Sequence, residues 1–568
     1  MSPRILTALL CATLSAIHAQ EATRTAAPAD PMVAAIFAEG LERSKVMEHL
    51  DHLTNRIGPR LTSSDRFTQA AEWARDTFQS FGLEARIEPW GEWPVGFNRG
   101  PWFGRMIEPT SLHLTFNTPA WSAGTTGRQR GFAMLAPTTA EAVEAQASQF
   151  EGRWMVEYPS RGGGRRRGGA EEAEASPEPR IDGTVRRLLD EAYAKAGILG
   201  VIRGSNDELL RTSGNWRISW DKLPKIPQIT VVRSEWLILE EHLRKGTPVE
   251  LEFDIRNYFR KGPITNYNVI AEIRGTEKPD EYVVVGGHLD SWDGATGTTD
   301  NGTGTSTTIE AARILAAVGA KPKRTIQFML WGGEEQGLLG SAAYCQARQD
   351  EMARTSACFV HDGGTNYVSG IAVTPSQKAD FEKIFAPVLL LHPDRPFAIR
   401  EVPRLSGGAS DHGSFLAQGV PGYFWDQAGR SVYGFGWHTQ HDTYNIAIPE
   451  YQSHTATIVA VAALGTANLP HLISRENMRS TAERPLQNRT LGVQFGDEGP
   501  AMAVAEVVAE GAAAKAGVKV GDILLEVDGT LLTDRFALRN AINTGEPKKT
   551  LKIKRGTEVL SLELTWTR

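Results

Sequence analysis

Six side chains that can bind divalent metals stand in the second half of the chain: His288, Asp300, Glu334, Glu335, Asp362 and His438. Four of them close or directly follow short apolar runs at 282–287, 326–333 and 357–361. Such runs predict buried parallel strands. Ligand sites in open α/β sheets lie at the carboxyl ends of the strands. We therefore expect three neighbouring strands to bring these side chains to one edge of a sheet.

Side chains of these types suit hydrolysis by a pair of metal ions. Two divalent ions about 3.5–4 Å apart acidify a shared water and stabilise the developing oxyanion. Such a centre needs a bridging carboxylate, separate ligands for each ion, and a base that is not a ligand. Two histidines and three carboxylates suit zinc, with Mn²⁺ or Co²⁺ as substitutes. Taken alone, Asp300 could equally be the cap of the helix predicted at 305–318.

The neighbours of these residues suggest further roles. Asp290 lies two residues after His288, and we expect its carboxylate to accept the second imidazole N–H and fix the tautomer. Glu334 and Glu335 are adjacent, so one can bind metal while the other, its pKa raised by burial, acts as the base. Three other histidines compete for ligand roles: His361, His412 and His441.

The order of these residues resembles peptidase family M28, the co-catalytic di-zinc exopeptidases that include aminopeptidases and glutamate carboxypeptidases. The matching motifs are H-x-D at 288–290, D-N-x-x-G at 300–304, E-E at 334–335, D at 362 and H-T-x-x-D at 438–442. The last motif selects His438 over His441. The stretches 287–293 and 322–325 are most similar to the carboxypeptidase Q branch of the family.

The resemblance implies a role for each matching residue. His288 and Asp362 would hold one Zn²⁺, Glu335 and His438 the other, and Asp300 would bridge the two. Glu334 would be the general base, and it would later return its proton to the leaving amine. Asp411 and His412 match a segment beside the substrate pocket. Many members have a tyrosine directly before the last histidine that helps to bind the oxyanion, whereas this chain has Trp437.

The alternation of strand and helix patterns predicts an α/β zinc-exopeptidase sandwich with a mixed, largely parallel central sheet. We assign 32–95 and 265–472 to this peptidase domain. In it, Asp65 is the expected cap of a second N-terminal helix, and 452–467 is a closing helix. Between the two parts, 96–262 reads as short strands and turns. It resembles a protease-associated insert and is expected to limit access to the cleft.

The C-terminal segment 486–568 resembles a PDZ domain, after a polar linker at 473–485. A short helix, a glycine turn and a strand ending in Asp-Gly follow one another over 511–529. Leu491, Gly492 and Val493 match the loop that holds the terminal carboxylate of a peptide. Such domains bind a chain end as an added strand. A domain that only packs on the enzyme remains an alternative.

The N-terminus has the pattern of a cleaved export signal. Arg4 is followed by a short apolar stretch to Ile17, and Ala19 precedes the expected cut. Export to the periplasm or the extracellular space would follow, and a retained membrane anchor is the alternative. No other segment is apolar enough to cross a membrane. The two cysteines of the mature chain, Cys345 and Cys358, are expected to be buried thiols.

Composition gives no reason to expect a nucleic-acid partner, because the net charge is −6 over 568 residues. The low-complexity stretch 161–180 reads as a surface loop rather than a basic arm, since acidic residues follow its arginines. We therefore expect an exported di-zinc exopeptidase acting on short peptides or dipeptides. The rival functions are a metal-free receptor-like binding protein and a single-zinc glutaminyl cyclase. Attack from the amino or the carboxyl end stays open.

Overall fold

The computed structural model describes residues 28–158, 181, 183–405, 410–478, 489–495, 502–508, 511–532, 538, 541–543 and 546–566. Apart from three residues, the chain divides into two compact units between Asn477 and Met478. The expected signal peptide at 1–19 and the loop at 161–180 lie outside the described residues, as does the second half of the linker.

Four helical elements begin the larger unit: α2 (Pro31–Glu42), α3 (Val46–Asp51), the π-helical η1 (His52–Ile57) and α4 (Asp65–Ser80). Helix α4 begins where the sequence predicted the second N-terminal helix. The cap of α4 is Ser64 rather than the predicted Asp65, because the Ser64 hydroxyl oxygen accepts the Phe67 N–H at 3.1 Å. Asp65 instead begins the first turn, where a carboxylate favours the positive end of the helix dipole.

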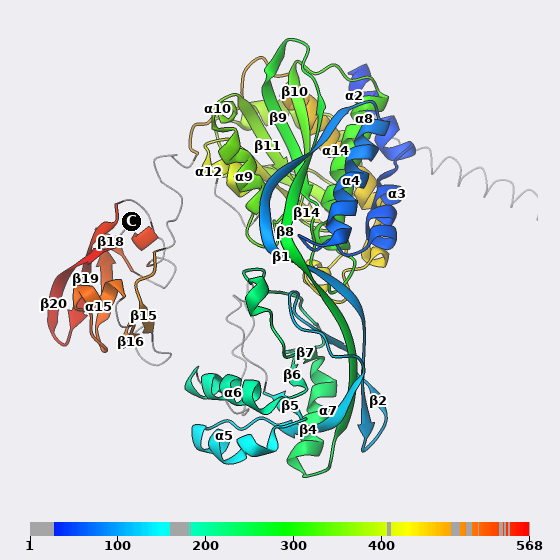
Figure 1. The fold of residues 1–568 in the computed structure, drawn as a ribbon. Coiled ribbons are helices and arrows are strands. Elements are labelled where there is room, and N and C mark those ends of the chain that lie inside the picture. Colours follow the sequence, from blue (N-terminus) through cyan, green and yellow to red (C-terminus); the bar gives the residue numbers. More distant parts are fainter. Residues whose placement is uncertain are drawn as a thin grey trace, which may run out of the picture. The chain divides into compact units, whose positions relative to one another are not determined.

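A mixed, largely parallel sheet forms the centre of the unit, as predicted (Figure 1). Its strands run in the order β13-β12-β14-β11-β9-β10-β8. Neighbours from β10 to β14 are parallel, whereas β8 pairs antiparallel with β10 and β12 antiparallel with β14. The strand bounds are β8 Glu250–Ile273, β9 Lys278–His288, β10 Arg324–Trp331, β11 Thr355–Val360, β12 Tyr367–Val373, β13 Ala398–Glu401 and β14 Gly422–Ala428.

Helices cover both faces of this sheet (Figure 1). On one face, α8 (Thr303–Ala317) and α14 (Pro449–Ala467) lie with α2, α3 and α4. On the other lie α9 (Leu339–Ala347), α10 (Gln349–Met352) and α12 (His412–Ala417). Cys345 and Cys358 belong to the apolar core of the second face and are buried free thiols, as predicted. Both faces of the sheet are therefore dry, which explains why its strands read as continuous apolar runs.

The inserted segment differs from the predicted short strands and turns. Strands β1 (Glu84–Glu108) and β8 are long antiparallel partners that run from the central sheet into the insert (Figure 1). Between them, β4 to β7 are parallel neighbours; α5 and α6 are crossover helices, and α7 follows β7. The bounds are β4 Gln129–Leu135, α5 Ala140–Gln146, β5 Trp154–Glu157, α6 Gly183–Ala196, β6 Gly200–Gly204, β7 Gln228–Val231 and α7 Arg233–Arg244. The prediction of strands and turns alone was wrong because parallel strands need crossover connections, and α5 and α6 supply two of them.

The smaller unit contains a short helix and antiparallel strands, as the predicted PDZ domain requires. Strand order is β18-β17-β19-β20, and β15 pairs with β16. The bounds are β15 Val493–Phe495, β16 Val504–Val507, α15 Ala512–Ala516, β17 Ile523–Val527, β18 Thr530–Leu531, β19 Lys548–Arg555 and β20 Glu558–Thr565. Before β15, Gly492 has a φ of +77°, and the Leu491 carbonyl accepts the Ala513 N–H at 2.8 Å.

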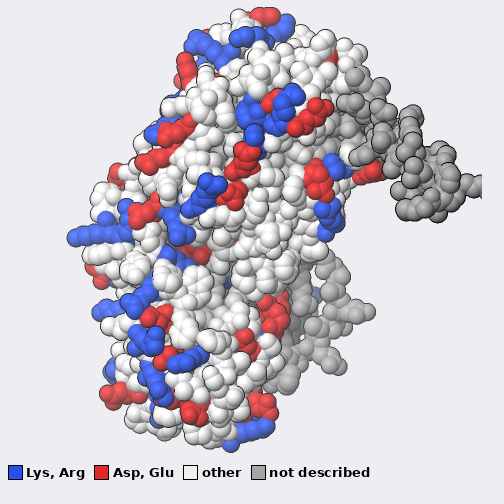
Figure 2. Space-filling model, turned by 90° about the vertical axis from the view of Figure 1, so that its right-hand side faces the viewer, with Lys and Arg blue, Asp and Glu red and all other residues white. Residues whose placement is uncertain are grey.

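Charged side chains of both signs are interspersed on the face seen in Figure 2. This distribution agrees with the small net charge and shows no stripe of one sign on that face. Among the described residues, no helix is both long and apolar enough for a membrane span.

Candidate metal centre

The register of the parallel strands brings the predicted residues to one edge of the sheet. On β9, His288 is directly opposite Trp331, the last residue of β10. Val360 at the end of β11 is opposite Gly286, so Asp362 follows at the same edge. Glu334 and Glu335 follow β10 in a turn. The neighbouring strands β9, β10 and β11 thus place His288, Glu334, Glu335 and Asp362 at one edge of the sheet.

Asp300 lies between the two histidines. Its Oδ1 atom is 3.1 Å from His288 Nε2, and its Oδ2 atom is 2.9 Å from His438 Nε2. It does not cap α8, whose N-cap position is Gly302. The carboxylate of Asp442 instead accepts the backbone N–H groups of Thr299 and Asp300, the second at 3.1 Å. The loop is therefore fixed so that one carboxylate faces two imidazoles.

The remaining side chains complete two sets around Asp300. His288 Nε2 lies 3.2 Å from Asp362 Oδ1, and His438 Nε2 lies 3.0 Å from Glu335 Oε2. Glu334 Oε2 is farther away, at 3.9 Å from His288 Nε2. Possible ligand atoms of His288, Glu334 and Asp362 all lie within 4.8 Å of one another, and so do those of His288, Asp300 and Glu335.

The donor set fits a pair of divalent cations. Tetrahedral ligands about 2.0–2.2 Å from a zinc ion are themselves roughly 3.3 Å apart, close to the separations of 2.9 to 3.2 Å found here. Four carboxylates surround two imidazoles in a buried site, so the cluster carries an excess of negative charge. Buried charges of this kind are stable when they are paired or coordinate metals.

The electrostatics of the centre reflect this crowding. Burial raises the pKa of Glu334 well above its ordinary value, and Asp362 and Asp411 add to the effect while His288 opposes it. Burial likewise raises the pKa of Glu335 to about 7, with Asp300 contributing. Burial lowers the pKa of His438, but the carboxylates of Glu335 and Asp300 outweigh it and bring the value to about 10. The carboxylates thus raise the pKa of His438, while His288 and His438 partly offset the rise in the pKa values of Glu334 and Glu335.

Asp290 does not act as predicted. The His288 Nδ1 atom lies 3.0 Å from the backbone carbonyl oxygen of Asp290, whereas the nearer carboxylate oxygen is 3.6 Å away. The carboxylate instead accepts the backbone N–H groups of Glu334 and Glu335, each at 3.3 Å, and the Thr62 hydroxyl at 2.8 Å. Asp290 lies only two residues after His288, so its backbone carbonyl can reach the His288 ring. Its carboxylate is then available to the turn that carries Glu334 and Glu335.

Arg60 is a buried residue of the centre that sequence reasoning missed. Its guanidinium donates to the backbone carbonyls of Leu289, Gly58, Thr296 and Gly297, at distances of 2.7 to 3.1 Å. Burial lowers its pKa to about 10, although Asp442 and Asp290 oppose the shift. A single arginine in a loop carries no sequence signal for burial, because its partners are backbone atoms, and three of the four are distant in the chain.

The three competing histidines take other places. His441 stacks on Phe435, with ring centroids 4.4 Å apart. His361 is buried and contacts Gln427, and burial lowers its pKa to about 4. His412 lies beside Phe424 in the wall of the cavity, and burial lowers its pKa to about 4 as well. The geometry therefore favours the pair that the motif spacing selected.

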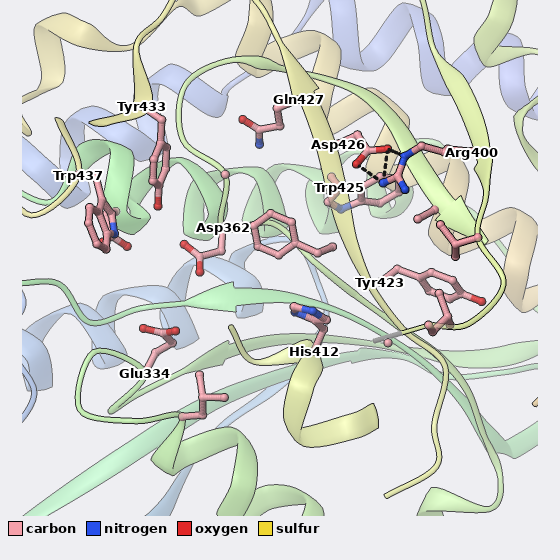
Figure 3. Close-up of a pocket in the computed structure, with 18 of the residues that line it drawn as sticks. Glu334, Asp362, Arg400, His412, Tyr423, Trp425, Asp426, Gln427, Tyr433 and Trp437 are labelled. Carbon is pink, nitrogen blue, oxygen red and sulfur yellow. Dashed lines mark hydrogen bonds and ion pairs between the residues drawn. The ribbon is translucent and has the colours of Figure 1, made fainter. Parts of the chain in front are cut away.

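A cavity of about 1040 Å³ opens beside the centre. Figure 3 shows Glu334 and Asp362 at one side of it and the Arg400–Asp426 ion pair at the other. Trp437 lines it and stacks on His438, with ring centroids 4.2 Å apart. All of its lining residues lie between 300 and 438, so among the described residues the insert contributes none to this wall. A smaller cavity at the centre is lined by Thr212 of the insert together with Asp300, Glu335 and His438. Limited access to the cleft stays a prediction.

Asp411 lies behind the wall of this cavity, next to His412, and Tyr433 lies in the wall itself. Asp411 is buried, and burial raises its pKa to about 7. It lies near enough to Glu334 to affect the pKa of that residue. Tyr433, which sequence reasoning missed, also lines the cavity (Figure 3). Burial raises the pKa of its phenol well above the ordinary value, and Asp300 and Asp362 add to the effect, so its hydroxyl keeps its proton and can donate a hydrogen bond.

Comparison with known proteins agrees with this geometry. Residues 268–462 match the model of peptidase family M28, and this range includes every predicted ligand. Residues 490–565 match the model of the PDZ domain. No family match bears on the protease-associated character of the insert, which stays a prediction.

Curated relatives extend the similarity over most of the chain. The chain is 27% identical to carboxypeptidase Q of Mus musculus over 448 residues, which cover 77% of this chain and 88% of that protein. It is 28% identical to carboxypeptidase Q of Homo sapiens over 456 residues, covering 78% and 89%. A crystal structure of a peptidase M28 precursor from Shewanella amazonensis SB2B has the same fold, with a TM-score of 0.55 and 23% identity over 78% of this chain and 97% of that chain.

Proposed function

We propose that this chain, a metallopeptidase of family M28 with a C-terminal PDZ domain, is a di-zinc exopeptidase that hydrolyses short peptides. One observation carries the proposal. The two carboxylate oxygens of Asp300 face two different histidines, at 3.1 and 2.9 Å, at the edge of a large cavity. A carboxylate in that position can bridge two ions, and a receptor-like protein would not need such an arrangement.

The ligand assignment follows from the distances. His288 and Asp362 would hold one zinc ion, His438 and Glu335 the other, and Asp300 both. When bound, the two ions supply an acidified water and polarise the scissile carbonyl. The Asp290 carbonyl holds the His288 ring from its Nδ1 side, at 3.0 Å, so that Nε2 points into the centre. A hydrogen bond of this kind to the second ring nitrogen fixes the tautomer of a metal-binding histidine.

Glu334 is the general base in this proposal. Its carboxylate lies 3.9 Å from His288 Nε2, outside the distances of 3.1 and 3.2 Å at which Asp300 and Asp362 lie. It faces the cavity (Figure 3). From there it accepts a proton from the attacking water and afterwards donates it to the leaving amine. Burial raises its pKa, which strengthens it as the base in the first transfer.

The cavity wall supplies the remaining contacts. We propose that the protonated hydroxyl of Tyr433 donates a hydrogen bond to the carbonyl oxygen of the substrate. It would replace the tyrosine that many family members have at the position of Trp437. The volume of about 1040 Å³ suits a short peptide. The relatives are named carboxypeptidase Q, which favours a substrate with a free carboxyl end.

Metal titration combined with product analysis tests the proposal. Protein stripped of metal by a chelator should bind two Zn²⁺ per chain, and hydrolysis of a mixed dipeptide and tripeptide library should rise with the second equivalent. A protein that binds no zinc would support the receptor-like alternative. A product formed by cyclisation, without added water, would support the cyclase alternative. Identification of the released residues decides between attack from the amino and from the carboxyl end.

Two further proposals concern the ends of the chain. We propose that the chain is exported after cleavage behind Ala19, on the pattern of its first residues. Mass spectrometry of protein recovered outside the cytoplasm should then find Gln20 as the first residue.

We also propose that the PDZ domain binds peptide C-termini at 491–493. Fluorescence titration with a peptide and its amidated form should show binding of the free carboxylate only.

A further inference from the structure

We propose that the inserted segment 96–262 fixes the position of His438 in the metal centre, and that Gln440 is the positioning residue that links the two. The inference rests on the proposed role of His438 as a metal ligand. It gives the insert a task besides the predicted one of limiting access to the cleft. The insert contributes no residue to the described wall of the cavity of about 1040 Å³.

His438 has a backbone conformation that needs external support. Its φ is +60°, in the left-handed region that few residues other than glycine adopt. Such a conformation persists where the surrounding structure enforces it. The carbonyl oxygen of His438 accepts the Thr212 N–H of the insert at 2.7 Å. The insert therefore contacts the backbone of the proposed ligand itself.

Gln440 joins the same loop to the insert at two more points. Its Oε1 atom accepts the Leu210 N–H at 2.8 Å, and its Nε2 atom donates to the Glu208 carbonyl at 2.9 Å. Both partners are backbone atoms, so their positions depend on the path of the chain rather than on side-chain rotamers. Together with Thr212, three hydrogen bonds tie the loop 438–440 to the strip 208–212.

The strip 208–212 is itself held by the body of the insert. The Thr212 hydroxyl oxygen accepts a hydrogen bond from Asn117 Nδ2 at 2.6 Å. Ser234, in the first turn of α7, donates its backbone N–H and its hydroxyl to the Glu208 carboxylate, each at 2.9 Å. The strip also approaches the peptidase closely, since a Cβ atom at Gly294 would collide with the Thr212 hydroxyl. The insert thus offers a fixed surface to the loop.

The consequence concerns one ion of the pair more than the other. His438 Nε2 lies 2.9 Å from Asp300 and 3.0 Å from Glu335, so a shift of the loop would open this ligand set first. His288 ends β9 and Asp362 follows β11 of the central sheet. Among the described residues, neither shares a hydrogen bond with the strip. Loss of contacts that orient a metal ligand typically costs 10–100-fold in metal affinity.

A comparison of two glutamine variants tests the proposal. Gln440→Met keeps the length of the side chain and removes both hydrogen bonds. Gln377→Met is the matched control, because Gln377 also bonds two backbone groups, the Thr374 N–H at 3.1 Å and the Ser474 carbonyl at 2.8 Å, both remote in sequence from the metal-binding loops. Zn²⁺ binding to the metal-free proteins is measured by competition with a chromogenic chelator, and the melting temperature is measured alongside.

We expect Gln440→Met to weaken the binding of one zinc ion by about 10–100-fold and to leave the other ion unchanged. Gln377→Met should lower the melting temperature without changing either affinity. Equal affinities in Gln440→Met and the wild type would overturn the proposal, and so would parallel losses at both ions or in both variants. Wild-type protein that binds fewer than two ions would contradict the proposed function instead.

A second variant tests the link from within the insert. Asn117→Ala removes the hydrogen bond to the Thr212 hydroxyl and leaves the loop 438–440 unaltered. It should weaken the same ion, by a smaller factor than Gln440→Met. If Gln440→Met does not fold, Asn117→Ala decides: a selective loss at one ion supports the proposal, and unchanged binding of both ions overturns it.

Discussion

The Oδ1 atom of Asp290 accepts the backbone N–H of Glu334 at 3.3 Å. Its second oxygen accepts the N–H of Glu335 at the same distance and the Thr62 hydroxyl at 2.8 Å. One buried carboxylate therefore holds the turn that carries both the proposed base and a proposed ligand. The role assigned to Asp290 from its spacing, a partner for the His288 ring, belongs to its backbone carbonyl instead.

Asp290→Asn should for this reason damage catalysis more than stability. An amide can accept only one of the two backbone N–H groups, because its NH₂ group repels the other. The turn then shifts, and misplacement of a reacting group by about 1 Å can cost roughly 100-fold in kcat. Steady-state kinetics give kcat and KM. Thr62→Val, which leaves both backbone bonds in place, is the control, and equal kcat values for the two variants would contradict the assignment.

Glu334→Gln should retain its metal and lose most of its turnover. The substitution removes the proton acceptor but no proposed ligand, and general acid–base catalysis contributes about 10²–10⁴-fold to rate. Metal content by plasma spectrometry and kcat on a dipeptide are measured on the same sample. The exposed Glu382→Gln serves as the control. Near-normal turnover of Glu334→Gln would mean that another group takes the proton.

His288→Ala should bind one zinc ion instead of two. The variant removes the only nitrogen ligand of its set and leaves His438, Glu335 and Asp300 in place. Metal content after dialysis against buffered zinc measures the difference. His441→Ala is the matched control, since His441 lies three residues from His438 and stacks on Phe435. Two ions in His288→Ala, or one in His441→Ala, would refute the ligand assignment.

Arg60→Met should lower the free energy of unfolding. Four backbone carbonyls lose their donor when the buried guanidinium is removed. A buried polar group left unpaired costs about 1–3 kcal/mol, so the total should reach roughly 3 kcal/mol or more. Urea denaturation measures it. The control is Arg86→Met at a half-exposed ion pair with Glu272, which should change stability by less than about 1 kcal/mol.

His454 should make the larger unit sensitive to acid. Burial lowers its pKa to about 3, and the nearby Arg395 and His392 add to the shift. Below about pH 6.5 the unfolded chain binds a proton that the folded chain excludes. Stability attributable to this group is therefore complete at neutral pH and falls as the pH drops from about 6.5 toward 3, by about 1.4 kcal/mol per pH unit.

His454→Phe should remove that part of the acid dependence. A phenyl ring suits the site, because neither nitrogen of His454 has a hydrogen-bond partner among the described residues. Denaturant unfolding at pH 7.5 and pH 5 measures the difference, and the exposed His113→Phe is the control. An unchanged difference between the two pH values in His454→Phe would show that other groups cause the acid sensitivity.

The chemistry of the centre was predictable from the sequence because it depends on residue types at the ends of strands. Apolar runs before His288, Glu334 and Asp362 predict parallel strands, and parallel strands place their carboxyl ends together. The structure places these residues at one edge, as expected from that rule. The C-terminal PDZ domain was equally predictable, since its turn motifs are local in the sequence. Burial of Cys358 was predictable because it lies in one of the apolar runs.

Contacts between backbone atoms and distant side chains were decided by tertiary structure alone. Backbone carbonyl or N–H groups take part in the contacts of Arg60, Asp290 and Gln440 described above. Nearly every residue carries such groups, so no spacing of residue types in the sequence predicts which of them will pair. The sequence did not predict the full length of strands β1 and β8. Each strand belongs both to the central sheet and to the insert, so its burial pattern changes along its length. The sequence alone determined which groups can do the chemistry, and the packing of remote segments determined what holds them in place.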